Sequence, residues 1–490
     1  MKMVCAMIAF EVNCMKREIF FLYILICILL FCGCSAKDMT DVPYSEIEAY
    51  RAEHPDREVT YSVTVGDVVL TDVTTEAVLK AEDAQQLMDK AEYLQHLTAI
   101  RFDGETLDAA ALNTLCDTFP HADITCDTLR FGGREVPFSA NHIDLSDFTS
   151  EELDAVSEGL RALPLLETAE LCGMDGSTIV SLDDAAALQA ARPDVRFSYR
   201  IEMFGQLLST DMERVEYFRE KIGDEGLAEL RKLLPMMYNL DYLLLDWCGT
   251  SDEATAQLRE DYADRFKVVW RVFVHPYNFL TDTYKVWMNY YVEDEDLQVL
   301  NYCTELRYVD MGHNSYTNCE WARNTPYLEA LIMGDSEVSS LEPLRECKNL
   351  TFLEVFTTKV TDLSPLEDCT ELRYLNISNL DIDDITPLYG LDNMVKLNST
   401  MNHIPAAQVE KYKELQPRCY ATFLPYGDPT EYEWRYYYND QINPRYLLLK
   451  HQMGYANGNV SGYPYGHVTE PITYESIGID PPPYEWQEWD

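Results

Sequence analysis

Hydrophobic positions repeat with a period of 22 residues between residues 306 and 404. Two columns at this spacing are Leu306, Leu328, Leu350, Leu372 and Met394, and Val309, Leu331, Leu353, Leu375 and Leu397. Each unit reads L-x-x-L-x-L, which places alternate residues of a short strand on one face. A single unit cannot bury that face, so the pattern predicts parallel strands that stack around a shared leucine core.

Each short unit continues as N-x-I and then L-x-P-L. The N position is filled by Asn314 and Asn402, and between them by Ser336, Thr358 and Leu380. A leucine side chain cannot hydrogen-bond to the backbone, so the turn near Leu380 must satisfy its polar groups in a different way.

Longer units of about 70 residues precede the short ones. Their marker is a helix that ends in a proline step and is followed by an alternating strand. The steps are His54-Pro55, Phe119-Pro120 and Arg192-Pro193, and the strands after them end at Gly66, Gly132 and Gly205, as a turn would require. The leucine strand returns inside the long units, at residues 166–171 and 240–245. The sequence therefore predicts one continuous solenoid whose repeats shorten toward the C-terminus.

The short units, such as VTDLSPL at residues 360–366, resemble the leucine-rich repeats of internalin-like bacterial surface proteins. Near the C-terminus, Glu433-Trp434-Arg435 and Asn443-Pro444-Arg445-Tyr446 resemble the Trp-Arg and Pro-Arg-Tyr signature that ends many such proteins. The resemblance implies an α/β solenoid. Its form would be a leucine-rich-repeat horseshoe with a parallel sheet on the concave face and helices or turns on the convex face.

Five segments follow from these patterns. They are a lipoprotein signal peptide and lipobox (1–34), an N-terminal linker and capping helix (35–53), the long leucine-rich units (54–300), the 22-residue repeats with a closing helix (301–419), and an aromatic C-terminal cap and tail (420–490). Residues 425–450 are expected to pack on the final repeat, because the end of a solenoid must be covered.

The N-terminal segment contains an apolar run of 13 residues, 19–31, preceded by two basic residues. The run is too short to span a bilayer comfortably and suits the hydrophobic part of a signal peptide. It leads into Gly33-Cys34, which resembles a bacterial lipoprotein box, although Phe31 stands where an aliphatic residue is usual. This implies a secreted chain, anchored by a lipid on Cys34 to the outer face of a bacterial cell membrane. The alternatives are an ordinary cleaved signal and a short anchor helix.

The chain has 84 acidic and 38 basic residues, a formal net charge of -46. Such a surface repels phosphate backbones, which argues against nucleic acid as a partner. Nine cysteines follow residue 34, an odd and dispersed set that makes a poor disulfide framework. Cys347 and Cys369 lie one repeat apart and are expected to fill equivalent core positions. The sequence after residue 34 has no CxxC pair, so it predicts no structural zinc site, and no cofactor is expected.

The sequence contains no nucleophile elbow, P-loop, HExxH pair or EF-hand loop. We therefore expect a binding protein rather than an enzyme, with a protein or a glycan as its ligand on the concave face. One alternative is an envelope scaffold without a specific ligand. Another is a carbohydrate-active enzyme that stacks sugars on the aromatic tail. The tail cluster consists of Trp434, Tyr436, Tyr437 and Tyr438.

Side chains between the leucines of each strand are expected to face the concave surface. There they would form an apolar ridge flanked by carboxylates and amides, and such rimmed patches often mark interaction sites. The predicted ligand-binding residues are Tyr308, Phe352, Glu354, Phe356, Tyr374 and Asn376. The alternative is that these rings pack on each other or beneath the tail, and contact no ligand.

Overall fold

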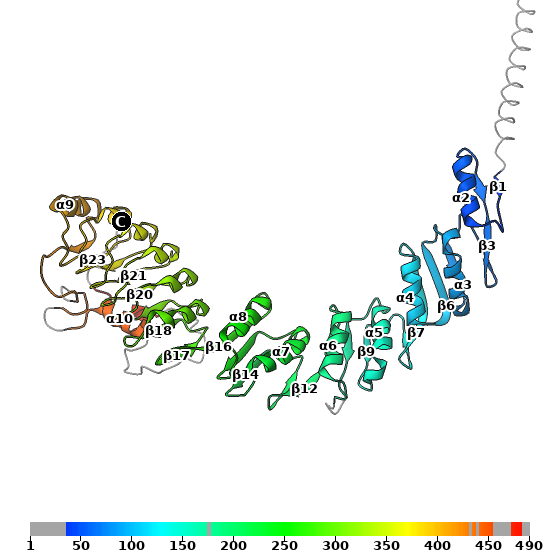
Figure 1. Cartoon of the computed structure of the whole chain (residues 1–490), viewed down its shortest axis with the longest axis horizontal. Coiled ribbons are helices and arrows are strands. Elements are labelled where there is room, and N and C mark those ends of the chain that lie inside the picture. Colours follow the sequence, from blue (N-terminus) through cyan, green and yellow to red (C-terminus); the bar gives the residue numbers. More distant parts are fainter. Residues whose placement is uncertain (1–35, 174–177, 431–433, 438–440, 454–471, 483–490) are drawn as a thin grey trace, which may run out of the picture. The chain divides into compact units, whose positions relative to one another are not determined.

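The computed structural model describes residues 36–173, 178–430, 434–437, 441–453 and 472–482. The predicted signal peptide and Cys34 lie outside the described residues. The chain divides into two compact units (Figure 1), Met1–Asp211 with Arg231–Tyr238, and Met212–Leu230 with Asn239–Asp490. In the part of the chain that is described, no helix combines the length and apolar character needed to cross a membrane.

The first unit builds its long repeats from alternating strands and helices. The helices are α2 (Tyr44–Glu53), α3 (Ala84–Asp89), α4 (Ala109–Thr118), α5 (Leu153–Arg161) and α6 (Leu182–Ala191). One sheet has the order β5 (Glu76–Val78), β6 (Ala99–Asp108), β7 (Asp123–Phe131) and β8 (Arg134–Pro137), and another has β9 (His142–Asp144), β10 (Thr168–Glu170) and β11 (Arg196–Ser198). Shorter pairs join β1 (Lys37–Asp38) to β2 (Val59–Thr60), β3 (Ser62–Val65) to β4 (Val68–Thr71), and β12 (Arg200–Met203) to β13 (Gln206–Ser209).

Hairpins interrupt the parallel strands at the predicted glycines. Gly66, Gly132 and Gly205 have φ angles of 57°, 50° and 77°, a region that glycine adopts without steric cost. They lie in the turns of the hairpins β3–β4, β7–β8 and β12–β13. The glycine turns predicted from the sequence are therefore confirmed.

The prediction of one continuous solenoid is wrong for the sheets. Strand β8 pairs antiparallel with β7 and takes the edge that the next parallel strand would need. The same happens in the second unit, where β17 (Tyr277–Leu280) pairs antiparallel with β16 (Lys267–Val274). The parallel strands therefore fall into separate sheets.

The second unit begins with the sheet β14 (Arg214–Phe218), β15 (Tyr242–Asp246), β16 and β17, accompanied by the helices α7 (Gly223–Leu233) and α8 (Asp252–Asp261). A seven-stranded parallel sheet follows. Its strands are β18 (Lys285–Trp287), β19 (Tyr308–Asp310), β20 (Ala330–Ile332), β21 (Phe352–Glu354), β22 (Tyr374–Asn376), β23 (Lys396–Asn398) and β24 (Tyr420–Thr422). Helix α9 (Ala406–Leu415) precedes β24, and α10 (Pro444–Met453) and α11 (Tyr474–Ile477) come after it.

The strand register of this sheet matches the 22-residue period. Tyr308 pairs with Ala330, Ala330 with Phe352, Phe352 with Tyr374, and Tyr374 with Lys396. The middle residue of each strand points to the side of the sheet opposite to its two neighbours and is fully buried. These residues are Val309, Leu331, Leu353, Leu375 and Leu397. The predicted stacking of parallel strands on a leucine core is therefore confirmed for this region.

Short 3-10 helices return the chain on the core side of each repeat. Those of the three central repeats are η7 (Glu342–Glu346), η8 (Ser364–Asp368) and η9 (Thr386–Gly390), and each has a proline in its first turn, where the missing N–H costs nothing. Cys347 and Cys369 follow two of these helices and are fully buried. Burial raises the pKa of Cys347 to about 12 and that of Cys369 to about 11, so both act as core thiols.

Asparagine side chains form hydrogen bonds with the backbone groups in the turn of the preceding repeat. The Asn314 amide donates to the Met288 carbonyl at 2.6 Å, and its oxygen accepts from the Val292 N–H at 3.0 Å. Asn402 makes the same contacts four repeats later, donating to the Ile377 carbonyl at 2.6 Å and accepting from the Leu380 N–H at 2.9 Å. The turn that carries Leu380 is thus completed by the next repeat, which is how the structure meets the requirement predicted from the sequence.

Candidate functional site

The seven-stranded sheet has a front face, formed by Tyr308, Ala330, Phe352, Tyr374 and Lys396 and by the residues two positions further along each strand. Its opposite side carries the buried leucines. The front face is the surface on which the sequence predicts a ligand. Strand alternation fixes which side chains point there, since successive residues of a strand face opposite sides.

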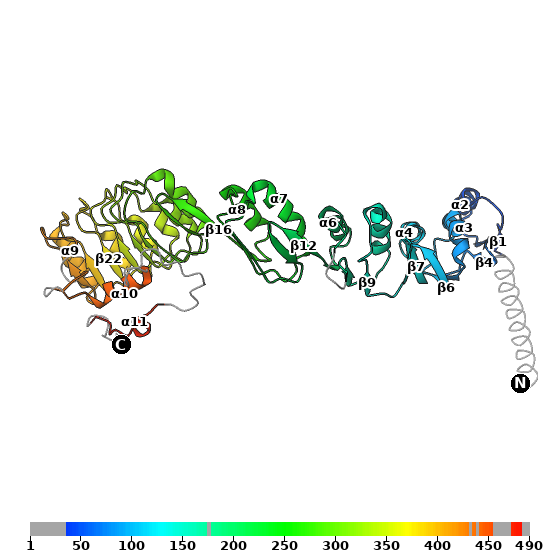
Figure 2. The same cartoon turned by 90° about the horizontal axis from the view of Figure 1, so that it is seen from below.

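We call the described residues 424–430, 434–437 and 441–453 the C-terminal segment, and they cover the front face. Helix α10 contacts β18 and β19, and Figure 2 shows it lying along the sheet. Trp434 is 5% exposed, with its ring centroid 5.6 Å from that of Phe352. Leu449 and Met453 of α10 complete an apolar cluster with the front-face rings.

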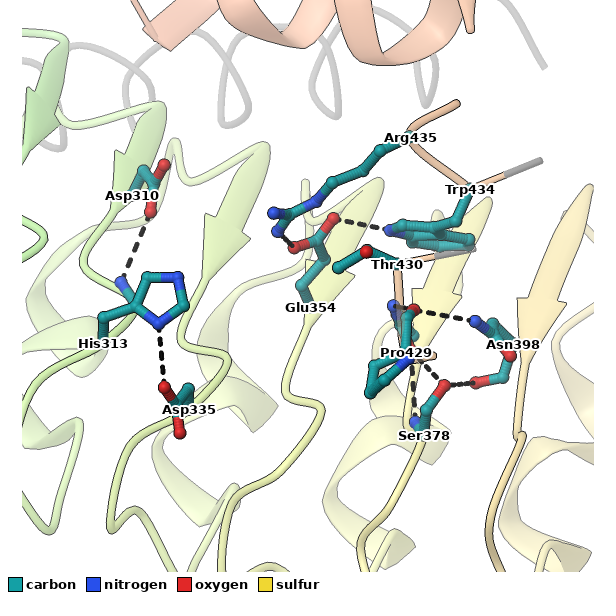
Figure 3. Close-up of polar contacts among 12 residues, drawn as sticks. Asp310, His313, Asp335, Glu354, Ser378, Asn398, Pro429, Thr430, Trp434 and Arg435 are labelled. Atoms are coloured by element: carbon teal, nitrogen blue, oxygen red, sulfur yellow. Dashed lines mark hydrogen bonds and ion pairs between the residues drawn. The ribbon is translucent and has the colours of Figure 1, made fainter. Parts of the chain in front are cut away.

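Glu354 forms the main polar contacts between the front face and the C-terminal segment. Its side chain is fully buried, and the indole Nε1 of Trp434 donates to Oε1 at 2.5 Å. Its other oxygen forms an ion pair with the guanidinium of Arg435, so two consecutive residues of the segment converge on one carboxylate (Figure 3). Burial is the largest single effect and lowers the pKa of Arg435, but the charge and hydrogen bond of Glu354, together with the charges of Tyr446 and Asp310, raise that pKa overall.

Two asparagines hold the start of the segment. The side-chain amides of Asn376 and Asn398 both donate to the carbonyl of Pro429, at 2.8 Å and 3.0 Å. Their side-chain oxygens accept from the hydroxyls of Ser378 and Thr400, at 2.6 Å and 2.7 Å (Figure 3). Each amide therefore has both its donor and its acceptor engaged.

Cations of the segment also lie on the front-face rings. The guanidinium of Arg445 is 4.9 Å from the ring centroid of Phe352 and 4.8 Å from that of Tyr374. The guanidinium of Arg435 is 5.5 Å from the ring of Phe356. Contacts of this kind attract a cation to the ring quadrupole, and more strongly where water is excluded.

The six predicted ligand-binding residues are brought together, but beneath the C-terminal segment. None is more than 6% exposed: Tyr308 4%, Phe352 3%, Glu354 0%, Phe356 6%, Tyr374 3% and Asn376 0%. The expectation that this ridge faces solvent is therefore wrong, and the alternative of packing beneath the tail describes the structure. The expected place of the tail is right in part: Pro429 accepts a hydrogen bond from Asn398 in the final repeat, but Trp434 and α10 lie farther along the front face, at β21 and at β18 and β19.

A second group of aromatic side chains stays exposed, on β14, on β16 and at the residue directly after β15. We call Phe218, Trp247 and Phe273 the aromatic cluster; they are 52%, 45% and 49% exposed. The rings of Trp247 and Phe273 meet edge to face, with centroids 5.0 Å apart. Phe218 is the strand partner of Asp246, the residue before Trp247. The cluster thus spans three neighbouring strands.

A buried ion pair supports the aromatic cluster. Asp246 accepts from Nε and Nη2 of Arg271 at 2.6 Å and 2.8 Å, and the two side chains are 0% and 4% exposed. The same guanidinium lies 5.7 Å from the ring centroid of Trp247. A bidentate pair of this kind fixes orientation as well as charge, so the position of the Trp247 ring is well defined.

Sequence reasoning missed this cluster for a clear reason. The leucine pattern predicts β15, but β14 and β16 lie outside the 22-residue period. The available signal was the alternation in Arg214–Phe218, where exposed and buried residues alternate along the strand. Among the described residues no group of His, Cys, Asp or Glu is arranged to hold a metal ion.

The strand register and leucine core define a leucine-rich-repeat fold. No protein-family description matches the sequence, and no curated protein matches it. Among solved structures, internalin C2 of Listeria monocytogenes is 15% identical over 50% of this chain and 84% of its own, with a TM-score of 0.27. The internalin InlF of the same species is 15% identical over 79% and 98%, with a TM-score of 0.25. A leucine-rich-repeat protein of Leptospira interrogans is 11% identical over 76% and 98%, with a TM-score of 0.27. At these TM-scores the likenesses carry no functional argument.

Proposed function

We propose that this chain is a bacterial surface lipoprotein, attached through Cys34, that binds a protein or a glycan without catalysing a reaction. The observation that carries the proposal is the exposure of three aromatic side chains next to one another at β14–β16. The lipid anchor is supported by the sequence pattern that ends at Gly33-Cys34.

The aromatic cluster is better suited to a ligand than the front face. Each of its rings leaves about half of its surface in water, which forgoes part of the stabilisation that burial would give. Aromatic side chains in exposed groups are frequent energetic centres of interfaces, and they also stack on the apolar faces of sugars. Phe356 borders a small pocket, but the other five predicted front-face residues lie beneath the C-terminal segment, which would have to leave them before an external ligand could reach them. We therefore assign the ligand to the aromatic cluster.

The two alternative functions fit these contacts less well. A scaffold without a ligand needs only small polar side chains on its open surfaces, and a Trp–Phe pair is not of that kind. An enzyme that stacks sugars on the aromatic tail would need those rings free. Trp434 is instead engaged with Glu354 and Phe352, although Tyr436 is 44% exposed.

The test uses the full mature chain with Trp247→Ala and Phe273→Ala combined. Binding would be measured against a glycan array and a panel of purified host surface proteins, with Tyr327→Ala as the control at another exposed ring, 51% exposed. We expect the paired change to weaken binding about 30-fold, which corresponds to a loss of about 2 kcal/mol. The melting temperature should stay close to that of the wild type, because neither ring is buried.

Two outcomes would contradict the proposal. A ligand that binds the paired variant as tightly as the wild type must use another surface. A chain that binds nothing on either panel, while folded, would favour the scaffold function.

A further inference from the structure

A small polar pocket opens on the front face beside the pair formed by Glu354 and Arg435. Its volume is about 210 Å³. The sheet and the C-terminal segment both contribute to its wall, which includes Trp287, Asn289, Asp310, Phe356, Arg435 and Tyr446. Gly334 also lines the pocket. A Cβ atom at this position would lie 2.5 Å from the Phe356 ring, so the absence of a side chain makes room for that ring.

The polar atoms of this pocket are incompletely paired. The Asp310 side chain is 4% exposed; it accepts a backbone hydrogen bond from the N–H of Gly312 at 3.3 Å and a side-chain hydrogen bond from Asn289. Within the described residues, Oδ1 of Asn289 and Nε of Arg435 are buried and have no hydrogen-bond partner. Buried polar atoms are nearly always paired in folded proteins, so an unpaired acceptor and an unpaired donor in one pocket point to a bound group.

The charges favour a neutral occupant. An anion would meet the carboxylates of Asp310 and Glu354. A cation would be attracted by Asp310 but repelled by Arg435, whose guanidinium is held in the wall by Glu354. A hydroxyl group both donates and accepts, so neighbouring hydroxyls can serve a carboxylate, an amide oxygen and an N–H together without burying a further charge.

The aromatic rings that line the pocket also suit a sugar. The ring centroids of Phe356 and Tyr446 lie 5.5 Å and 5.2 Å from the Arg435 guanidinium, and Trp287 of β18 also lines the pocket. Aromatic side chains offer apolar faces on which the C–H groups of a sugar can lie. We propose that this pocket binds one neutral sugar ring at the end of a glycan. Its hydroxyls would donate to Asp310, and small side-chain movements would bring Oδ1 of Asn289 and Nε of Arg435, which have almost no accessible surface in this structure, within hydrogen-bond distance.

This inference deepens the proposed function by giving a ligand class at a second place on the same unit. It rests on that function only in supposing that glycans surround the protein. The contacts involved are separate from Phe218, Trp247 and Phe273, so each can fail alone. A chain whose Trp247 variant binds normally would refute the aromatic cluster and leave the pocket unaffected.

The test measures saturation-transfer difference NMR on the full mature chain with the methyl glycosides of glucose, galactose and mannose, and with N-acetylglucosamine. Butylammonium is the cationic probe. We expect transfer to at least one sugar, with a Kd on the order of 1 mM for so small a ligand. Asp310→Asn should weaken its binding about tenfold or more, because a charged acceptor is lost. The control Asp381→Asn changes a carboxylate that is 88% exposed, and it should have no effect.

A second variant, Asn289→Ala, keeps the test decisive if Asp310→Asn changes the shape of the pocket. It removes one unpaired acceptor from the wall and should weaken the same sugar about fivefold, with near-ultraviolet circular dichroism confirming the native fold. Absence of transfer to all four sugars would overturn the proposal. So would sugar binding that is unchanged in every folded pocket variant. Butylammonium binding tighter than any sugar, and lost in Asp310→Asn, would show a cation site instead.

Discussion

Removing the charge of Glu354 tests how strongly the C-terminal segment is held on the front face. Glu354→Gln keeps a side chain of the same shape and an oxygen for the indole of Trp434, but it leaves Arg435 without its counter-ion. Breaking a buried ion pair by removing one partner costs about 3 to 5 kcal/mol. The Arg435 side chain is 17% exposed, so water can solvate part of its unpaired charge. We therefore expect a loss of about 3 kcal/mol, at the lower end of this range.

The assay is native-state hydrogen exchange at the amides of Leu448 and Leu449 in α10. These amides exchange when the segment opens, so a loss of about 3 kcal/mol should speed their exchange about a hundredfold. The matched control is Glu337→Gln, since Glu337 pairs with Lys359 at 3.8 Å on the surface and its side chain is 56% exposed. An exposed pair contributes at most about 1 kcal/mol, so this change should leave α10 unaffected.

A double-mutant cycle decides whether the pair itself is responsible. Arg435→Gln alone leaves Glu354 buried and uncompensated, and should also cost about 3 kcal/mol. With both changes no charge is left unpaired. The double variant should therefore lose at least about 2 kcal/mol less than the sum of the single losses. Additive losses would refute the reasoning, because they would mean that the two side chains act independently.

Three further changes probe other parts of the chain. Burial, and then the charge of Glu354, raise the pKa of Asp310 to about 6 from 3.8. The ionised carboxyl therefore destabilises the folded state, and this loss of stability grows as the pH rises from about 4 to about 6. Urea titration should find Asp310→Asn equal to the wild type near pH 4 and about 3 kcal/mol more stable at pH 7; a difference that does not change with pH would contradict this. Asn402→Ala removes the acceptor of the Leu380 N–H and should cost about 1 to 3 kcal/mol in urea titration, whereas no loss would show that water replaces the amide. Cys34→Ala should abolish labelling of the protein by a clickable fatty acid and release it from the membrane, and full labelling would place the lipid elsewhere.

The repeat region could be predicted from the sequence because its structure is local and periodic. Leucines at a fixed spacing determine which face of each strand is buried, and burial of that face against the next unit sets the register. Tyr308, Ala330, Phe352 and Tyr374 pair across strands as their spacing predicts. The need for an alternative partner at the Leu380 turn could likewise be predicted, because an unsatisfied buried backbone group is costly wherever it occurs.

The separation of the sheets was harder to predict. Gly132 and Gly205 indicate turns, but a turn does not say which strand edge the returning strand will occupy. That depends on whether β8, which follows β7 directly, or a later parallel strand pairs with the free edge of β7, and the local sequence of a strand does not determine its partner.

Only the tertiary structure decided what covers the front face. Trp434 reaches Glu354 across 80 residues of sequence, and nothing in the spacing of either residue marks them as partners. Exposed and covered rings look alike in a strand pattern, because the alternation tells which side a ring faces and not what lies over it. The pocket around Asp310 has the same origin. Its carboxylate comes from the repeats and Arg435 comes from the tail, so the site exists only once the aperiodic segment has folded back onto the periodic one.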